Sequence, residues 1–153
     1  MIILGVRASA QEIRYAVLEK NASGSIVFHN QASENRLKYP ANMEKVEEKV
    51  RWAKEEFDRI LRQIPNIDKI ILKMNEYAGT ENGAKRETTY VDAVLLLCAA
   101  EHGIPIDRKL NSQIGSTAST ARERAENRVG RTMQYWNNTM ADAILAAYWE
   151  VRK

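Results

Sequence analysis

The feature that most constrains the fold is the order of the apolar segments. Residues 2–8, 12–19 and 25–29 are short apolar segments, and only a few small, polar or turn-forming residues separate them. Connections this short predict three antiparallel strands in a meander. After residue 42 the pattern changes, because helical periodicity begins to alternate with short apolar segments. A chain with this order is expected to form a mixed sheet covered by helices.

The remaining elements follow one another without an internal repeat or a linker. The first helical pattern is the clearest, since apolar residues from Met43 to Ile64 recur at intervals of three and four. Asn42 is its candidate N-cap, and Pro65 ends it. We expect further strands at 68–74 and 104–106, helices at 88–102, 118–133 and 139–152, and loops at 30–41, 75–87 and 107–117.

Together these elements predict one α/β domain over residues 1–153. The expected sheet has five strands with 2–8 at its centre. If the strands are numbered in chain order, their order across the sheet is 3-2-1-4-5. The neighbours of the central strand are expected to be 12–19 and 25–29, antiparallel, on one side, and 68–74 and 104–106, parallel, on the other. Crossover connections between parallel strands carry helices, so both faces of the sheet should be covered.

The composition is that of a folded globular protein with a mild positive charge. The chain is 44% apolar and 28% charged, which argues against disorder, and its net charge of +3 is compatible with a polyanionic partner without demonstrating one. Cys98, the only cysteine, lies in an apolar run and predicts a buried, reduced thiol. "MIILGV" lacks the basic start of a signal peptide, and no apolar run approaches the roughly 20 residues of a membrane helix. We therefore expect a cytoplasmic protein with no membrane partner.

A basic segment near the C-terminus is a candidate nucleic-acid surface. At helical spacing, Arg124, Arg128 and Arg131 fall on one face, Arg122 lies apart, and Tyr135 and Trp136 follow directly. Guanidinium groups suit phosphates and aromatic rings stack on bases, so Arg122, Arg124, Arg128, Arg131 and Trp136 are the candidate contacts to DNA or RNA. A solvated helix face with the aromatic residues in the core is the alternative interpretation.

Motifs for other chemistries are missing from the sequence. His29 and His102 do not have the spacing of a zinc site, and there is no glycine-rich phosphate loop or nucleophile elbow. The residues therefore predict no cofactor.

Three stretches carry a family resemblance. These are "IILGVRASAQEIRYAVLE" at the start, "IDKIILKMN" in the middle and "NNTMADAILAAYW" at the end. In these stretches the chain resembles the ribonuclease H-like superfamily, most closely its RuvC-type branch of Holliday-junction resolvases. It also resembles a small bacterial family of RNase H-like proteins of unknown function, in which the middle strand likewise has a lysine where the glutamate should be.

The resemblance implies that the catalytic carboxylates are largely lost. The aspartate of the first strand falls on Arg7, the glutamate of the fourth strand on Lys73, and the two aspartates of the last helix on Thr139 and Asp142. Two-metal cleavage needs several carboxylates to hold its cations, so one carboxylate between two fixed positive charges predicts that no metal binds there.

Several interpretations of these positions stay open. Arg7 and Lys73 are ordinary strand-end charges if the match is shifted by a residue or two. If the match holds, Arg7 either forms a structural ion pair with Asp142 or joins Lys73 in binding phosphate. Alternatively, Glu12, Glu76 or Glu87 supplies relocated carboxylates to a nuclease or junction resolvase that depends on Mg²⁺ or Mn²⁺.

We expect a non-catalytic module that binds nucleic acid through the basic helix and the degenerate cleft. The first alternative is a protein-interaction or regulatory scaffold with the same fold, for which a homodimer is one form, and the second is the metal-dependent nuclease. Fold alone does not decide among them.

Overall fold

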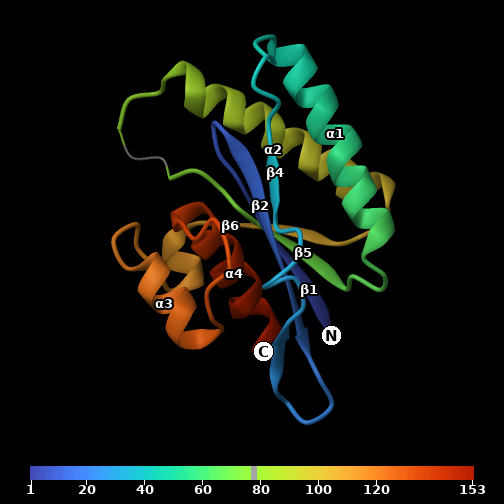
Figure 1. The fold of residues 1–153 in the computed structure, drawn as a ribbon, viewed down its shortest axis with the longest axis vertical. Coiled ribbons are helices and arrows are strands. Elements are labelled where there is room, and N and C mark those ends of the chain that lie inside the picture. Colours follow the sequence, from blue (N-terminus) through green and yellow to red (C-terminus); the bar gives the residue numbers. More distant parts are fainter. Residues whose placement is uncertain (77–78) are drawn as a thin grey trace.

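A mixed sheet separates two layers of helices (Figure 1). The structure is a computed structural model that describes residues 1–76 and 79–153. Helices α1 and α2 cover one face, while α3 and α4 cover the other. The strands are β1 (Ile2–Ala8), β2 (Glu12–Lys20), β3 (Ile26–Phe28), β4 (Arg36–Lys38), β5 (Lys69–Lys73) and β6 (Ile106–Lys109). The helices are α1 (Val46–Gln63), α2 (Gly83–Glu101), the 3₁₀ helix η1 (Asn111–Ile114), α3 (Ala121–Arg128) and α4 (Asn138–Val151).

The sheet has the order β3-β2-β1-β5-β6, which confirms the expected arrangement around a central first strand. β2 runs antiparallel to β1, while β5 and β6 run parallel to it. One strand was missed, because β4 lies in the segment 30–41 that the sequence analysis assigned to a loop. β4 pairs antiparallel with the start of β2 and has only Leu37 buried, and its three residues are too few to reveal strand periodicity in the sequence.

Several element boundaries differ from the expected ones. α1 begins at Val46 with Lys45 at the N-cap position, so Asn42 is not the cap. α2 begins at Gly83, five residues before the expected start at Thr88, because the Asn82 side chain accepts a hydrogen bond from the Lys85 N–H at 2.9 Å. The last strand and η1 occupy most of the expected connection 107–117. Of the expected loop 75–87, residues 77–78 lie outside the described residues.

The largest error concerns α3, which spans Ala121–Arg128 instead of 118–133. Gly130 has φ +130°, a value that L side chains rarely adopt, and it turns the chain away from the helix axis. Arg131 therefore lies beyond the helix, and the expected helical face shared by Arg124, Arg128 and Arg131 does not form.

The two faces of the sheet are lined by alternate residues of each strand. On β1, Leu4, Val6 and Ala8 belong to the core beneath α1 and α2, whereas Ile3 packs against α4. At Gly5 the contact with α4 is so close that a Cβ atom would lie 2.0 Å from the Ala143 carbonyl oxygen. α4 therefore lies directly on the centre of the sheet, which places its first turn over the ends of β1 and β5.

A row of basic residues crosses the sheet in register. Arg7 on β1 pairs with Arg14 on β2 and with Lys73 on β5. The row continues to Arg36 on β4, the partner of Arg14, and to Lys109 on β6, the partner of Lys73. Because register partners project from the same face of a sheet, this cationic row of Arg36, Arg14, Arg7, Lys73 and Lys109 lies on the face that carries α4.

One smaller expectation is met, and one further property of the helices can be stated. Cys98 is fully buried among the residues of α1 and α2, as its apolar surroundings predicted. Among residues 1–76 and 79–153, none of the helices combines the length and the apolar character that spanning a membrane requires.

Candidate nucleic-acid interface

The candidate site is a cleft of about 340 Å³ where β1 and β5 end and α4 begins. It forms there because β1 and β5 are parallel, so that Arg7 and Lys73 are register partners at one edge of the sheet. The residues that line the cleft are Arg7, Lys73, Asn75, Glu76, Lys85, Asn111, Ala118, Asn138, Thr139 and Asp142. The four positions that the resemblance matched to catalytic carboxylates thus surround one cavity.

Arg7 forms an ion pair with Asp142 from the second turn of α4. The distance from Arg7 Nε to Asp142 Oδ2 is 3.4 Å, and Arg7 Nη1 donates to the Lys73 carbonyl oxygen, also at 3.4 Å. Both contacts are long for charge-assisted hydrogen bonds, which are normally about 2.7–2.9 Å. The guanidinium group therefore keeps hydrogen-bonding capacity that its own chain uses weakly.

Lys73 is held more tightly. Its side chain is 1% exposed, and Nζ donates to the Met74 carbonyl oxygen at 2.6 Å and to Glu76 Oε1 at 3.0 Å. Glu76 Oε1 also accepts the Asn111 backbone N–H at 2.7 Å, which ties the end of β5 to the start of η1. Glu76 thus supplies the carboxylate that compensates the buried ammonium group.

The acidic groups near the two cations respond differently to their surroundings. Burial raises the pKa of Asp142 above its usual range, although the charges of Lys73 and Arg7 oppose the effect. Burial also raises the pKa of Glu76, but the Asn111 N–H and the Lys73 ammonium group outweigh it, and the net shift is downward. On α2, burial raises the pKa of Asp92 to about 7 against the opposing charges of Arg7 and Lys73, and its Oδ1 atom has no hydrogen-bond partner among the described residues.

The donor set of the cleft does not fit a pair of divalent cations. Only Glu76 and Asp142 contribute carboxylates, and each is paired with a cationic side chain. Of the other candidate carboxylates, Glu12 is engaged with Arg14 and Arg36, and Glu87 pairs with Lys49 of α1 at 3.0 Å. Within residues 1–76 and 79–153, acidic, histidine and cysteine side chains do not form any group of three that could hold a metal ion.

The basic residues of α3 lie away from the cleft. Arg124 Nη1 donates to the Gly115 carbonyl oxygen at 2.5 Å, and the Arg128 guanidinium group lies 5.4 Å from the ring centroid of Tyr148. Tyr148 is in the last turn of α4, whereas Thr139 and Asp142 are in its first two turns. None of Arg122, Arg124, Arg128 and Arg131 lines the cleft, so the expectation that they border it is not met.

The two aromatic residues after α3 occupy different environments. Trp136, the candidate for base stacking, is partly buried against the core beneath α4, with the Arg131 guanidinium group 6.0 Å from its ring. Tyr135 is 59% exposed. The exposed aromatic residue is therefore Tyr135 and not Trp136, the residue predicted to stack on a base.

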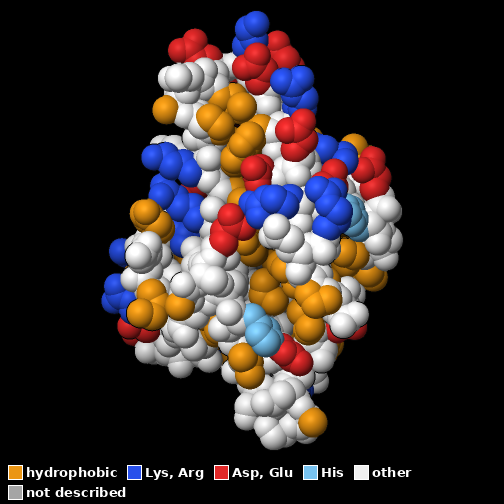
Figure 2. Space-filling model, turned by 45° about the vertical axis from the view of Figure 1, so that its right-hand side comes forward, with side chains coloured by type: hydrophobic (Ala, Val, Ile, Leu, Met, Phe, Trp, Pro, Cys, Tyr) orange, Lys and Arg blue, Asp and Glu red, His pale blue; other side chains and the backbone are white. Residues whose placement is uncertain are grey.

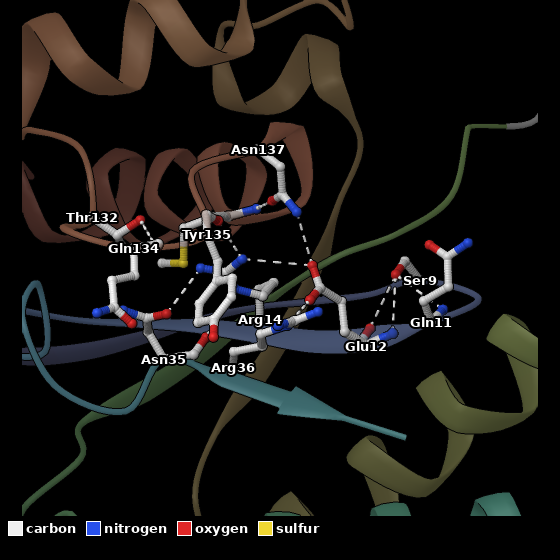
Figure 3. Close-up of polar contacts among 11 residues, drawn as sticks. Ser9, Gln11, Glu12, Arg14, Asn35, Arg36, Thr132, Gln134, Tyr135 and Asn137 are labelled. Carbon is white, nitrogen blue, oxygen red and sulfur yellow. Dashed lines mark hydrogen bonds and ion pairs between the residues drawn. The ribbon is translucent and has the colours of Figure 1, made fainter. Parts of the chain in front are cut away.

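A buried polar network holds Tyr135 in place (Figure 3). Arg14 is fully buried, and its guanidinium group donates to the Tyr135 carbonyl oxygen at 2.6 Å, to the Asn35 carbonyl oxygen at 3.1 Å and to Asn35 Oδ1 at 2.9 Å. Glu12 lies 3.6 Å from Arg14 and accepts a hydrogen bond from Arg36 at 2.5 Å. The Asn137 side chain donates to Glu12 at 2.9 Å and caps α4 by accepting the Met140 N–H.

This network is not evident from sequence periodicity. The available signal was the pair Glu12 and Arg14, since two charges at alternate positions of an otherwise apolar strand share one face. Their partners come from β4 and from the segment between α3 and α4, which carry no comparable pattern.

The overall fold matches solved structures of Holliday junction resolvases. RuvC of T. thermophilus in complex with a Holliday junction substrate has a TM-score of 0.79 at 13% identity, covering 99% of this chain and 94% of that one. The yeast mitochondrial Holliday junction resolvase has a TM-score of 0.66 at 15% identity, covering 98% and 77%. Fowlpox virus resolvase in complex with Holliday junction DNA has a TM-score of 0.57 at 12% identity, covering 98% and 97%.

These similarities confirm the RuvC-type, ribonuclease H-like fold that the sequence predicted. No family model matches the sequence, and a search of curated proteins finds no match. At identities of 12–15% the shared feature is the fold.

Proposed function

We propose that this protein binds the phosphate backbone of nucleic acid in the cleft and does not cleave it with divalent metals. The observation that carries the proposal is the pair Arg7 and Lys73 at the ends of β1 and β5, the positions that hold carboxylates in the RuvC-type pattern. Fixed positive charges there repel divalent cations and attract phosphate.

The other side chains of the cleft favour an anionic ligand. The lining holds three cations, Arg7, Lys73 and Lys85, against the carboxylates of Glu76 and Asp142. The remaining polar groups are the amides of Asn75, Asn111 and Asn138 and the hydroxyl of Thr139. Asn138 and Thr139 also begin α4, and the N-terminus of a helix attracts negative charge. The solved structures of the T. thermophilus and fowlpox virus resolvases with Holliday junctions support nucleic acid as the class of ligand.

A separate observation favours a protein-interaction scaffold as the second candidate. An apolar hollow of about 430 Å³ lies between the end of α1 and β2, lined by Ile2, Val17, Ile64 and Pro65 among others. Figure 2 shows hydrophobic side chains open to solvent on this face, beside a histidine. On α2, Tyr90 and Leu97 are also exposed, about two turns apart on the helix, and they offer a surface for a homodimer.

Thr139 gives the sharpest test of the proposal. T139D adds a negative charge to the cleft, while a carboxylate in the first turn of α4 is compatible with helix stability. We expect T139D to weaken binding by about 1–4 kcal/mol at low salt, the range of one charge–charge interaction at about 4 Å. The measurement is fluorescence anisotropy of labelled four-way junctions and single-stranded DNA and RNA at several salt concentrations.

A22D is the matched control, because Ala22 is exposed in the turn between β2 and β3. In Figure 1 this turn lies at the opposite end of the sheet from the C-terminal ends of β1 and β5. A22D changes the net charge equally and should leave binding almost unchanged. If both variants bind as the unchanged protein does, the cleft is not the binding site, and a wild-type protein with no affinity at any salt favours the scaffold.

The non-catalytic part of the proposal needs a separate assay. The same substrates are incubated with Mg²⁺ or Mn²⁺, and we expect retention without cleavage. Metal-dependent cleavage that D142N abolishes would establish the nuclease instead.

A further inference from the structure

We propose that Tyr135 is a stacking platform for one unpaired base of the bound strand. This inference rests on the proposed function and adds a second contact, outside the cleft, with its own chemistry. The ligand it takes is a nucleobase that is not paired, as in a single strand or at an opened junction.

The ring of Tyr135 is supported on one side and accessible from solvent. The Arg36 guanidinium group lies 4.3 Å from the ring centroid, and Glu12 holds Arg36 through the hydrogen bond from Nε at 2.5 Å. The side chain nevertheless remains 59% exposed. A guanidinium group on one face leaves the other face of a ring free to stack on a base.

The backbone of Tyr135 is held in a conformation that tyrosine rarely adopts. Its φ is +57°, in the left-handed region, and such conformations persist only where the surrounding structure imposes them. Here the constraint is visible, because the buried Arg14 binds the Tyr135 carbonyl oxygen and Asn137 caps α4 two residues later (Figure 3). A backbone fixed before binding loses little conformational entropy when a ligand arrives at the ring that it carries.

The space beside the ring suits the polar edge of a base. Tyr135 borders a hollow of about 510 Å³ whose lining includes Gln31, Ser33 and Gln134. These side chains supply amide and hydroxyl groups that both donate and accept hydrogen bonds. Large apolar residues are few in this lining, so the hollow suits a base better than the apolar anchor of a protein partner.

The position of Tyr135 relative to the cleft is compatible with one continuous strand. Asn138 and Thr139, three and four residues later, line the cleft. In the cationic row, Arg36 beneath the ring and Arg7 in the cleft are separated by β2, so their strands are two spacings, or about 10 Å, apart. About three nucleotides cover this distance at the 3.4 Å rise of a duplex strand.

The test separates stacking from phosphate binding by comparing two oligonucleotides with identical backbones. One is a labelled 12-mer of thymidine, and the other is the abasic 12-mer. We expect the unchanged protein to bind the thymidine strand about tenfold more tightly, as one stacked base contributes roughly 1–3 kcal/mol. Y135L keeps an apolar side chain over Arg36 but removes the ring, and it should lose the preference while retaining affinity for the abasic strand. Y135W should restore the preference.

Each failure has a distinct meaning. An unchanged preference for the thymidine strand in Y135L would overturn the stacking role. An equal loss of affinity for both strands would also overturn it, because that result indicates that Tyr135 only supports the fold. Binding that T139D weakens but that shows no base preference would overturn this inference and leave the proposed function standing. No binding of either strand would overturn both.

A second measurement needs no variant. Oligonucleotides that carry 5-iodouracil cross-link to aromatic side chains on which the base stacks when they are irradiated. We expect the cross-linked peptide to contain the adduct on Tyr135. An adduct confined to Trp136 would overturn the inference. So would the absence of any adduct when 5-iodouracil is placed at each position of the strand in turn and the strand is shown to be bound.

Discussion

The two halves of the cationic row use the same kind of side chain in opposite ways. Arg14 is fully buried and makes three hydrogen bonds of 2.6–3.1 Å with backbone and side-chain oxygens. Arg7 occupies the paired position on the next strand, yet its two contacts are both 3.4 Å and it borders an open cleft. One arginine is fully engaged within the protein, and the other is mostly buried but makes only long contacts at the edge of the cleft.

This difference indicates that two arginine residues in the same row of a sheet can have different roles. One stabilises the fold, and the other is available for the proposed binding. A buried charge is tolerated when every donor finds a partner, and it then holds together the elements that supply those partners. The Arg14 half joins β2 and β4 to the segment before α4, whereas in the Arg7 half Lys73 is buried against Glu76 and Arg7 lines the cleft. The next three experiments test this division.

R14M is expected to have the largest effect. It removes the donor for the Tyr135 and Asn35 carbonyl oxygens and one of the two cationic partners of the buried Glu12. Breaking such a buried pair costs about 3–5 kcal/mol, so the free energy of unfolding in urea should fall by that amount. E12Q keeps the shape of its side chain and should cost less. A loss below about 1 kcal/mol for R14M would show that the network does not hold this part of the fold.

D92N tests, through pH, a buried carboxyl group of α2 whose pKa responds to the charges of Arg7 and Lys73. The pKa of Asp92 is raised to about 7, so the folded protein binds its proton more tightly than the unfolded chain. Its contribution to stability is therefore full below about pH 4, falls as pH rises towards 7, and is then constant. The shift corresponds to at most about 4 kcal/mol.

D92N should abolish most of this decline, so the variant should be more stable than the unchanged protein at pH 8. The measurement is urea unfolding of both proteins between pH 4 and 8. Parallel pH profiles for the two proteins would show that Asp92 ionises without a penalty.

R7M should cost less than R14M, about 1–2 kcal/mol at pH 7. Burial already raises the pKa of Asp142, and once Arg7 is lost this carboxyl group can take up a proton instead of remaining as an unpaired charge. The cost should therefore shrink as pH falls towards 5, and D142N combined with R7M should recover part of it. If R7M costs as much as R14M at every pH, the two halves of the row are equivalent and the comparison fails.

The meeting of Arg7, Lys73 and Asp142 could be predicted from the resemblance, which matches all three to one catalytic site, and the topology explains why they meet. Parallel neighbouring strands end at the same edge of a sheet, and a helix that crosses the sheet centre brings its first turns to that edge. Those relations depend on the order of elements, which the apolar periodicity of β1, β5 and α4 shows clearly.

The exposed ring of Tyr135 and the extent of α3 could not be predicted in this way. Both depend on tertiary contacts of polar residues, namely the bond from Arg14 to the Tyr135 carbonyl oxygen and the turn at Gly130. Periodicity carries no information on where a polar segment leaves its helix. The expected helix was therefore too long, and it wrongly included Arg131.

The cationic row also bears on how the sheet avoids misfolding. Successive strand residues point to opposite faces, so a slip of β2 by one residue would turn Glu12 and Arg14 towards the apolar core beneath α1 and α2. The same slip would remove Ile13 and Tyr15 from that core. Desolvating a guanidinium group without its partners is far more costly than misplacing an aliphatic side chain. The buried charges of Glu12 and Arg14 thus also discriminate against wrong pairings while the sheet assembles.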